Sequence, residues 1–199
     1  MHTVEVFSKK FYKRDPALVA RDMLGKTLIR KLDSRILSGK IVETEAYYGR
    51  SDPASRAYKG RKRFNELMFL DAGRFFIYMV HANWLLNIVA HMEASVGAVL
   101  IRALEPLEGI EVMKKNRDTK DKRDLTSGPG KLTKALAITN ELNGIDVTRT
   151  NEQLMLVRGE IESFSIGSSP RIGVKADLPQ ELRFYIKRNI FVSRYLRTG

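Results

Sequence analysis

The chain has 199 residues, with 35 Lys and Arg against 23 Asp and Glu, and it contains no cysteine. The missing cysteines exclude disulfides, thiolate zinc sites, iron–sulfur clusters and a cysteine nucleophile. With 43% apolar and 29% charged residues, the composition predicts a folded protein rather than a disordered chain. No apolar run is long enough for a membrane-spanning helix, and the first residues lack the apolar segment of a secretory signal. We therefore expect an intracellular protein.

The excess of basic residues, a net charge of +12 with a pI near 9.9, is clustered along the chain. Lys and Arg dominate the segments 50–63, 114–134 and 171–197, whereas the segment 135–170 is net acidic. Clustered cations can neutralise phosphates and release counterions, which indicates a nucleic-acid partner. A solvated basic surface without a partner explains the same charge, so charge alone leaves both interpretations open.

A helix and several strands are predicted in the first half of the chain. Asp15 and Pro16 are typical of a capped helix start, and Gly25 is typical of a helix end. A polar, basic and turn-rich loop is expected over residues 48–66. The apolar runs around it predict strands over residues 27–32, 36–47 with a break at Ser38-Gly39, and 75–80.

The stretch from Trp84 to Val89 is predicted to be a core helix, and Asn87 interrupts its apolar stripe. A buried amide must find hydrogen-bond partners, and the edge of a bound base is one candidate partner for Asn87.

The second half of the chain mixes strands with short helices. One helix is expected over residues 106–116, with Pro106 in its first turn, and another over residues 131–138, after a charged loop. Strands are expected over residues 99–104, 154–157, 161–166 and 182–186. Because strands do not alternate regularly with long helices, we do not expect a doubly wound parallel sheet. Without repeats or linkers, the chain is predicted to form a single mixed α+β domain over residues 1–199.

The segment from Ile41 to Gly49 carries two carboxylates in an otherwise apolar strand. Side chains alternate between the two faces of a strand, so Glu43, Glu45 and Tyr47 share one face. If this face borders a cleft, a glutamate can act as general base on water beside a ring on which a planar ligand stacks. A solvent-facing strand with two exposed carboxylates fits the same pattern, which leaves both readings open.

Two other positions combine charge with an unusual setting. Arg102 lies inside an apolar strand, where its charge must be paired with a phosphate, with Glu45 or with a purely structural ion-pair partner. The turn 127–131 before a helix offers backbone N–H groups and the Lys131 charge to a phosphate, or it is an ordinary helix entry. It is not a P-loop, because Leu132 follows the lysine where Ser or Thr is needed.

Motifs for metals and cofactors are missing from the sequence. The three histidines, His2, His81 and His91, lack the spacing of a metal-ligand motif, and no acidic cluster has the spacing of a calcium loop. The sequence has neither a Gly-rich dinucleotide motif nor the nucleophile-elbow motif of hydrolases. We expect no metal and no cofactor.

Taken together, these segments resemble the alkyladenine (3-methyladenine) DNA glycosylase family, over residues 11 to about 192. Four blocks carry the resemblance in order and spacing: residues 20–26 (ARDMLGK), 41–47 (IVETEAY), 100–109 (LIRALEPLEG) and 128–132 (GPGKL). The resemblance implies a single domain with a central curved, mostly antiparallel β-sheet flanked by helices, like the C-terminal domain of formyltransferases. It also implies an enzyme that flips a damaged purine nucleotide out of duplex DNA and hydrolyses its N-glycosidic bond.

The resemblance further implies roles for individual residues. Glu45 matches the general base that activates water, and Arg102 matches a catalytic-site residue near the phosphate of the flipped nucleotide. Tyr47 and Tyr78 match rings that stack on the flipped base, and Asn87 matches the amide that rejects the exocyclic amine of normal guanine. Alkylation puts positive charge on a purine, which improves it as a leaving group and attracts it to tyrosine faces. No Schiff-base lysine is needed, so we expect a monofunctional glycosylase without lyase activity.

The chain departs from the family pattern at three places. Arg56 stands where the family usually has a His at the base edge, and its charge would repel a cationic base unless it turns to a phosphate. The segment 80–84 is about one residue short, so His81, with Trp84 as its rival, replaces the usual tyrosine wedge in the DNA. The loop 60–65 also differs from the usual Arg-Asn pair. The expected base contacts include Arg56, and the expected DNA contacts are His81, Arg61 and Lys131.

Two other functions remain open on the sequence. One is a non-catalytic nucleic-acid-binding domain on the same fold, motivated by Arg56 and His81, and the other is an RNA-binding module like that of formyltransferases. The partner expected for the glycosylase is double-stranded DNA with damaged purines, bound by a monomer away from membranes. The expected location is the cytoplasm, in association with the nucleoid in a prokaryote, or the nucleus in a eukaryote.

Overall fold

The computed structural model describes residues 5–159 and 163–194, and one long strand, β2 (Arg35–Tyr47), organises its sheet. The first part of β2 pairs with β1 (Thr27–Leu32), and β5 (Ala98–Glu108) follows the other edge of β2 from Ser38 to Tyr47. Beyond the end of β1, β8 (Arg183–Ile186) pairs with residues 43–45 of β2. The second half of β2 is therefore enclosed by a strand on each edge.

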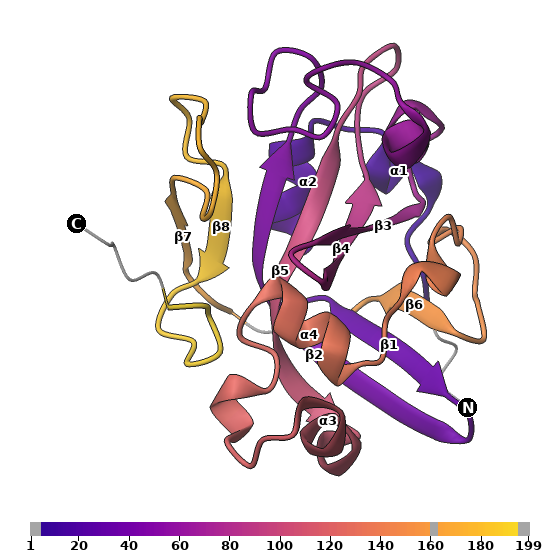
Figure 1. Cartoon of the computed structure of the whole chain (residues 1–199), viewed down its shortest axis with the longest axis vertical. Helices are drawn as coiled ribbons and strands as arrows, with labels where there is room; N and C mark the ends of the chain where they lie inside the picture. Colours follow the sequence, from indigo (N-terminus) through magenta and orange to yellow (C-terminus); the bar gives the residue numbers. More distant parts are fainter. Residues whose placement is uncertain (1–4, 160–162, 195–199) are drawn as a thin grey trace.

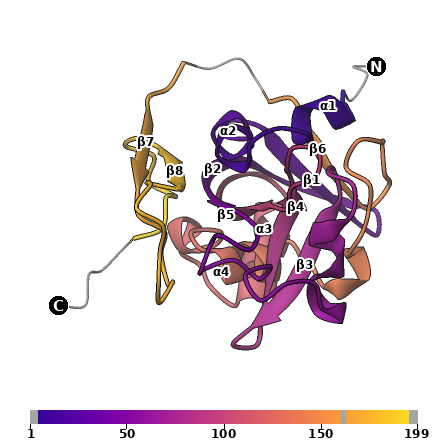
Figure 2. The same ribbon diagram turned by 90° about the horizontal axis from the view of Figure 1, so that it is seen from above.

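All pairings in the eight-stranded sheet are antiparallel. The main path runs β3 (Phe75–Val80), β4 (Asn83–Val89), β5, β2, β1 and β6 (Leu154–Val157), and β7 (Ile166–Ser169) pairs with β8. The sheet curls into an open half-barrel, and β7 and β8 stand at one side of it (Figure 1, Figure 2). The predicted mixed α+β class with a curved antiparallel sheet is confirmed.

Short helices flank this sheet. The α-helices are α1 (Lys9–Tyr12), α2 (Pro16–Asp22), α3 (Ile110–Arg117) and α4 (Pro129–Ala135), and 3-10 helices span Arg63–Phe69, Lys122–Asp124 and Asn140–Leu142. Helix α2 begins as predicted, because the Asp15 carboxylate accepts the N–H of Ala17 at 2.8 Å and Pro16 occupies the first turn. It packs on β2, where the Thr44 hydroxyl donates to the Ala20 carbonyl at 2.9 Å.

The predicted helix over residues 84–89 is wrong, because this stretch forms strand β4. His81 and Ala82, both with positive φ (46° and 59°), form a two-residue turn that pairs β4 with β3. Residues 86–89 of β4 are buried on both faces of the strand, so their apolar run shows no alternation. A short apolar run of this kind does not distinguish a buried strand from a helix.

Other element boundaries also shift from their predicted positions. Residues 106–108 end β5 instead of opening a helix, and α3 starts only after Gly109, whose φ is +75°. Pro106 lies opposite Gly39, next to a register shift at the predicted break, where a strand tolerates a residue without an N–H. The helix expected over 131–138 begins and ends earlier, as α4. The strand expected over 161–166 falls partly outside the described residues, and β7 begins at Ile166.

A layer of charged side chains is buried where β2, β5 and β8 meet. Glu43 is completely buried, and its carboxylate accepts hydrogen bonds from Arg102 of β5 at 2.9 Å and Arg183 of β8 at 2.7 Å. The backbone N–H and hydroxyl of Ser193 each donate to it at 2.7 Å. Burial acts to raise the pKa of Glu43, but Arg102, Arg183 and Ser193 together hold it below its ordinary value. The carboxylate therefore stays charged and joins three strands.

Replacing this carboxylate is expected to destabilise the fold in a pH-dependent way. Because the pKa of Glu43 is lowered by folding, its stabilisation is full above its ordinary value of 4.5 and is lost as the pH falls through the folded-state pKa. Glu43→Gln removes the negative charge that Arg102 and Arg183 share, so the free energy of unfolding should fall by about 3–5 kcal/mol at pH 7. Urea denaturation from pH 7 to pH 3 measures this loss and should show a shallower pH dependence in the variant.

Glu111→Gln is the matched control, because the Glu111 side chain is 83% exposed on α3 and its ion pair with Lys114 lies at the surface. It should change stability by less than about 1 kcal/mol. Equal stability of wild type and Glu43→Gln at pH 7, or parallel pH profiles, would contradict a charged Glu43 as the link between the strands.

Candidate active site

A cavity of about 490 Å³ opens at the end of β2. Its walls come from Tyr47, the loop 53–56, the β3–β4 hairpin, the start of α4 and the segment 172–174. Segments far apart in the sequence therefore meet at one place. Helix α4 approaches the hairpin closely, since a Cβ on Gly130 would lie 2.8 Å from the Cβ of Asn83, and only glycine fits there.

Glu45 lies directly behind the wall of this cavity and is completely buried. Its carboxylate accepts the Tyr47 hydroxyl at 2.7 Å and the Ile172 N–H at 2.8 Å, and Arg102 Nη1 lies 3.2 Å from Oε2. These three residues all line the cavity. A carboxylate has about four acceptor positions, and two of them take the hydrogen bonds from Tyr47 and Ile172, so acceptor capacity remains for a water molecule. The predicted face with Glu43, Glu45 and Tyr47 is confirmed, and exposed carboxylates are excluded.

Tyr47 and Arg102 both hold the charge of Glu45 in place. Burial, and then the Glu45 carboxylate, raise the pKa of Tyr47 well above its ordinary value, so its hydroxyl remains a donor. Burial acts to lower the pKa of Arg102, but Glu45 and Glu43 raise it above its ordinary value. The side-chain partners of Arg102 are thus both glutamates, and pairing with Glu45 was one of the options that the sequence left open.

Arg171 is a central residue of the site that the sequence did not predict. Its side chain is completely buried and donates two hydrogen bonds to the Asp52 carboxylate, both at 2.7 Å, and others to Asp177 and to the Ala46 carbonyl. Its guanidinium lies 4.5 Å from the centroid of the Tyr47 ring. It therefore fastens the loop after β2 and the segment after residue 171 to the end of β2. No local pattern marks this pairing, because Asp52 and Arg171 are 119 residues apart.

Tyr78 and Arg56 form the opposite part of the wall. The Arg56 guanidinium lies 4.8 Å from the centroid of the Tyr78 ring, and Phe76 packs on Tyr78 with a centroid distance of 5.0 Å. Burial raises the pKa of Tyr78, and Arg56 acts against this rise. Buried Asn65 holds the Arg56 loop, since its Nδ2 donates to the Arg56 carbonyl at 2.7 Å.

His81 lies exposed in the β3–β4 turn and lines the cavity. Its rival Trp84 is half-buried, packs against the main core and does not line the cavity, and its carbonyl accepts the Thr133 hydroxyl of α4 at 2.8 Å. Of the two candidates for a wedge, only His81 lines the cavity.

Three other predicted residues lie outside the cavity wall. Asn87 is buried behind it, and its Nδ2 donates to the carbonyls of Phe76 at 3.1 Å and Leu85 at 3.2 Å. Arg61 forms an exposed ion pair with Glu66. Lys131 forms an ion pair with Asp124 beside the start of α4, and lines a neighbouring, smaller cavity.

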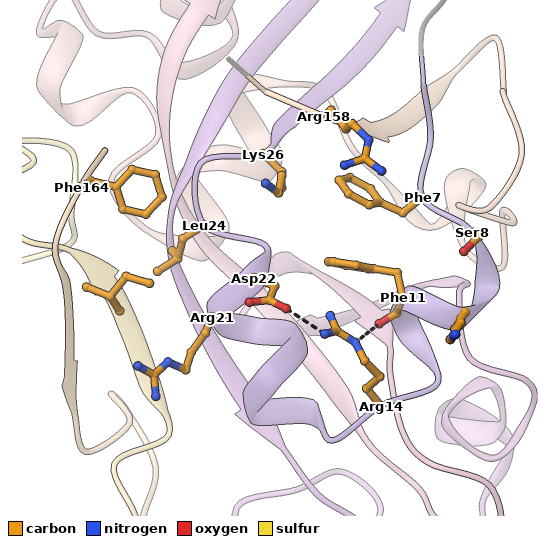
Figure 3. Close-up of a pocket in the computed structure, with 12 residues that line it drawn as sticks. Phe7, Ser8, Phe11, Arg14, Arg21, Asp22, Leu24, Lys26, Arg158 and Phe164 are labelled. Atoms are coloured by element: carbon orange, nitrogen blue, oxygen red, sulfur yellow. Dashed lines mark hydrogen bonds and ion pairs between the residues drawn. The ribbon is translucent and has the colours of Figure 1, made fainter. Parts of the chain in front are cut away.

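A second cavity, of about 620 Å³, lies at α1 and α2 and contains none of the predicted site residues. Figure 3 shows Phe7 and Phe11 on one side of it and Leu24 and Phe164 on the other. Its carboxylate, Asp22, is 53% exposed and paired with Arg14. Without a buried carboxylate beside its rings, this cavity lacks the groups for the chemistry of the first.

Within residues 5–159 and 163–194, no group of three or more His, Asp or Glu side chains could hold a metal ion. Over the same residues, no helix has the length and apolarity needed to cross a membrane.

The comparison with known proteins agrees with this arrangement. The family model for methylpurine-DNA glycosylase (MPG) matches residues 10–190. A protein of Carboxydothermus hydrogenoformans is 42% identical over 188 residues, which cover 94% of this chain and 97% of the relative. A protein of Aeropyrum pernix is 40% identical over 188 residues (94% and 92%), and one of Mesorhizobium japonicum 40% over 180 residues (90% and 86%). Each carries the name "Putative 3-methyladenine DNA glycosylase".

A family match over most of the length and this level of identity settle the classification. A carboxylate and two tyrosines at one cavity, in a chain with clustered basic charge, fit a base-excision repair enzyme that acts on N-glycosidic bonds in DNA. The chain belongs to the methylpurine-DNA glycosylase family.

Proposed function

We propose that this DNA glycosylase excises alkylated or deaminated purines of the 3-methyladenine, 7-methylguanine and hypoxanthine class. In this proposal the enzyme flips the damaged nucleotide out of the duplex, and Glu45 activates the water that hydrolyses the N-glycosidic bond. One observation carries the proposal: the buried Glu45 carboxylate accepts hydrogen bonds from Tyr47 and Ile172 and forms an ion pair with Arg102, and all three residues line a ring-bearing cavity.

The chemistry asks for a fixed negative charge beside the sugar of the flipped nucleotide. As the bond to the base breaks, the sugar becomes oxocarbenium-like, and a nearby carboxylate stabilises this charge while it accepts a proton from water. The donors on Glu45 fix its position before the substrate arrives, so little reorganisation is needed during the reaction. Water is the only nucleophile required, and we propose a monofunctional enzyme without lyase activity.

We propose that duplex DNA binds to the enzyme across the β3–β4 hairpin. His81 protrudes from a tight turn next to the cavity, which suits a side chain that fills the gap left by an extruded nucleotide. Arg61 and Lys131 are proposed to contact backbone phosphates on either side. We further propose that the enzyme acts as a monomer, in the nucleoid of a prokaryote or the nucleus of a eukaryote, since its substrate is chromosomal DNA.

The role of Glu45 is tested by Glu45→Gln, which keeps the shape of the side chain but removes its charge. Base release from duplexes with 3-methyladenine, 7-methylguanine or hypoxanthine should fall by about 10²-fold or more, while duplex affinity should stay within about two-fold, because Glu45 is buried away from the surface. Glu152→Gln, an exposed glutamate, is the control and should release base at the wild-type rate.

Base release that survives Glu45→Gln would remove Glu45 from the catalytic role. Duplex binding by the wild type without release of any damaged base would instead favour the non-catalytic nucleic-acid-binding domain. Tighter binding of tRNA than of duplex DNA would favour the RNA-binding module.

The clustered basic charge predicts a strong salt dependence of duplex binding. Each phosphate neutralised by Lys or Arg contributes about 0.9 to the log–log slope of affinity against salt, so Lys131→Gln should reduce the slope by about one. Lys31→Gln removes an exposed charge near the end of β1 and should leave the slope unchanged. Fluorescence anisotropy over a salt series measures the slope, and a wild-type slope near zero would contradict a phosphate-binding surface.

A further inference from the structure

We propose that Arg56 determines the substrate preference of this enzyme, in favour of neutral 6-oxopurines such as hypoxanthine and against purines made cationic by alkylation. The inference rests on the proposed function and names the substrate class of the same cavity. Three observations lead to it: the place of Arg56 on the Tyr78 ring, the charge balance around the cavity, and the donor geometry of a guanidinium.

Arg56 occupies the position that a cationic base would use. A cation is attracted to the face of a tyrosine ring, which is how Tyr78 would hold an alkylated purine. The Arg56 guanidinium already lies 4.8 Å from the centroid of that ring and lines the cavity with it, while buried Phe76 packs on Tyr78 from outside the cavity wall. An incoming cation must therefore displace Arg56 or lie beside its charge.

The Tyr47 ring also has an arginine on it, but this arginine does not line the cavity. The arginine on its ring, Arg171, is completely buried and does not line the cavity, so the face of Tyr47 toward the cavity remains available for stacking. Arg171 also shares its charge with Asp52 and Asp177, whereas Arg56 has no carboxylate within ion-pair distance among the described residues. Of these two arginines, Arg56 is the one that lines the cavity, so its charge is the one that a ligand in the cavity would meet.

Arg56 also removes the negative charge that would attract a cationic base. Around the cavity, the carboxylates Glu43, Glu45, Asp52 and Asp177 are balanced by the arginines Arg56, Arg102, Arg171 and Arg183. Without Arg56 the carboxylates would exceed the arginines by one. Arg56 is exposed at the cavity wall, where solvent screens part of its charge, and this difference favours a cationic ligand when Arg56 is absent and a neutral ligand when it is present.

A guanidinium offers only donors, arranged as a planar fork, and this selects among neutral bases as well. A 6-oxopurine presents two acceptors, O6 and N7, on the edge that arginine pairs with in DNA recognition. Hypoxanthine has both acceptors. In 7-methylguanine the methyl group blocks N7, and 3-methyladenine presents an amine instead of O6, so both lose part of the pairing in addition to carrying charge.

The test compares base release from hypoxanthine, 7-methylguanine and 3-methyladenine duplexes in single-turnover reactions, corrected for spontaneous loss of each base. Two variants separate charge from geometry: Arg56→Gln removes the charge, and Arg56→Lys keeps the charge without the fork. The matched control is Arg35→Gln, because Arg35 is exposed at the start of β2. Equilibrium binding of the same duplexes with a 2′-fluorinated lesion nucleotide, which resists hydrolysis, gives a readout independent of catalysis.

In Arg56→Gln, the ratio of cationic to neutral lesions, both released and bound, should rise by about three-fold or more over wild type. Arg56→Lys should release the cationic lesions at the wild-type rate but hypoxanthine more slowly, and Arg35→Gln should leave both rates unchanged.

An unchanged or lowered ratio in Arg56→Gln, in release or in binding, would overturn the proposal. If no lesion is released by the wild type but the binding ratio still shifts, the selectivity of Arg56 stands and only the proposed catalytic function fails.

Discussion

Two glutamates buried side by side on one strand link the pairing of the sheet to the charge of the cavity. A buried carboxylate is costly unless it is paired and hydrogen-bonded, and Glu43 and Glu45 are both completely buried on β2. Their partners come from the strands on the two edges of β2: Arg102 from β5 and Arg183 from β8. Strand pairing therefore brings the charged side chains together, and the ion pairs between them in turn stabilise the strand pairing.

This arrangement gives the cavity a fixed charge pattern before any ligand binds. Arg102 contacts both glutamates, so the residue that stabilises the fold through Glu43 also orients Glu45 toward the cavity wall. Arg171 extends the same pattern outward, because it holds the loop after β2 and stacks on Tyr47. The same residues thus stabilise the fold and position Glu45, and a substitution in this layer affects both stability and the site.

Features that depend on local periodicity were predictable from the sequence. Alternation along a strand placed Glu43, Glu45 and Tyr47 on one face, and the cost of an isolated charge in an apolar strand indicated that Arg102 must be paired. The capped start of α2 at Asp15 follows in the same way from local chemistry.

Features that depend on distant segments were not predictable. The pairing of Arg171 with Asp52 and the hydrogen bond from the Ile172 N–H to Glu45 exist only because the chain returns to the end of β2 through β7 and β8. Strand β4 was mistaken for a helix because burial on both of its faces removes the alternation that identifies a strand.

The most direct measurement is a crystal structure of the enzyme bound to a duplex that contains a 2′-fluorinated hypoxanthine nucleotide, which resists cleavage. We expect an extruded base that stacks on Tyr47 inside the 490 Å³ cavity, with its sugar beside a water held by Glu45. A damaged nucleotide that remains stacked in the helix, or a base bound away from Tyr47 and Tyr78, would rule out this cavity as the site of base excision.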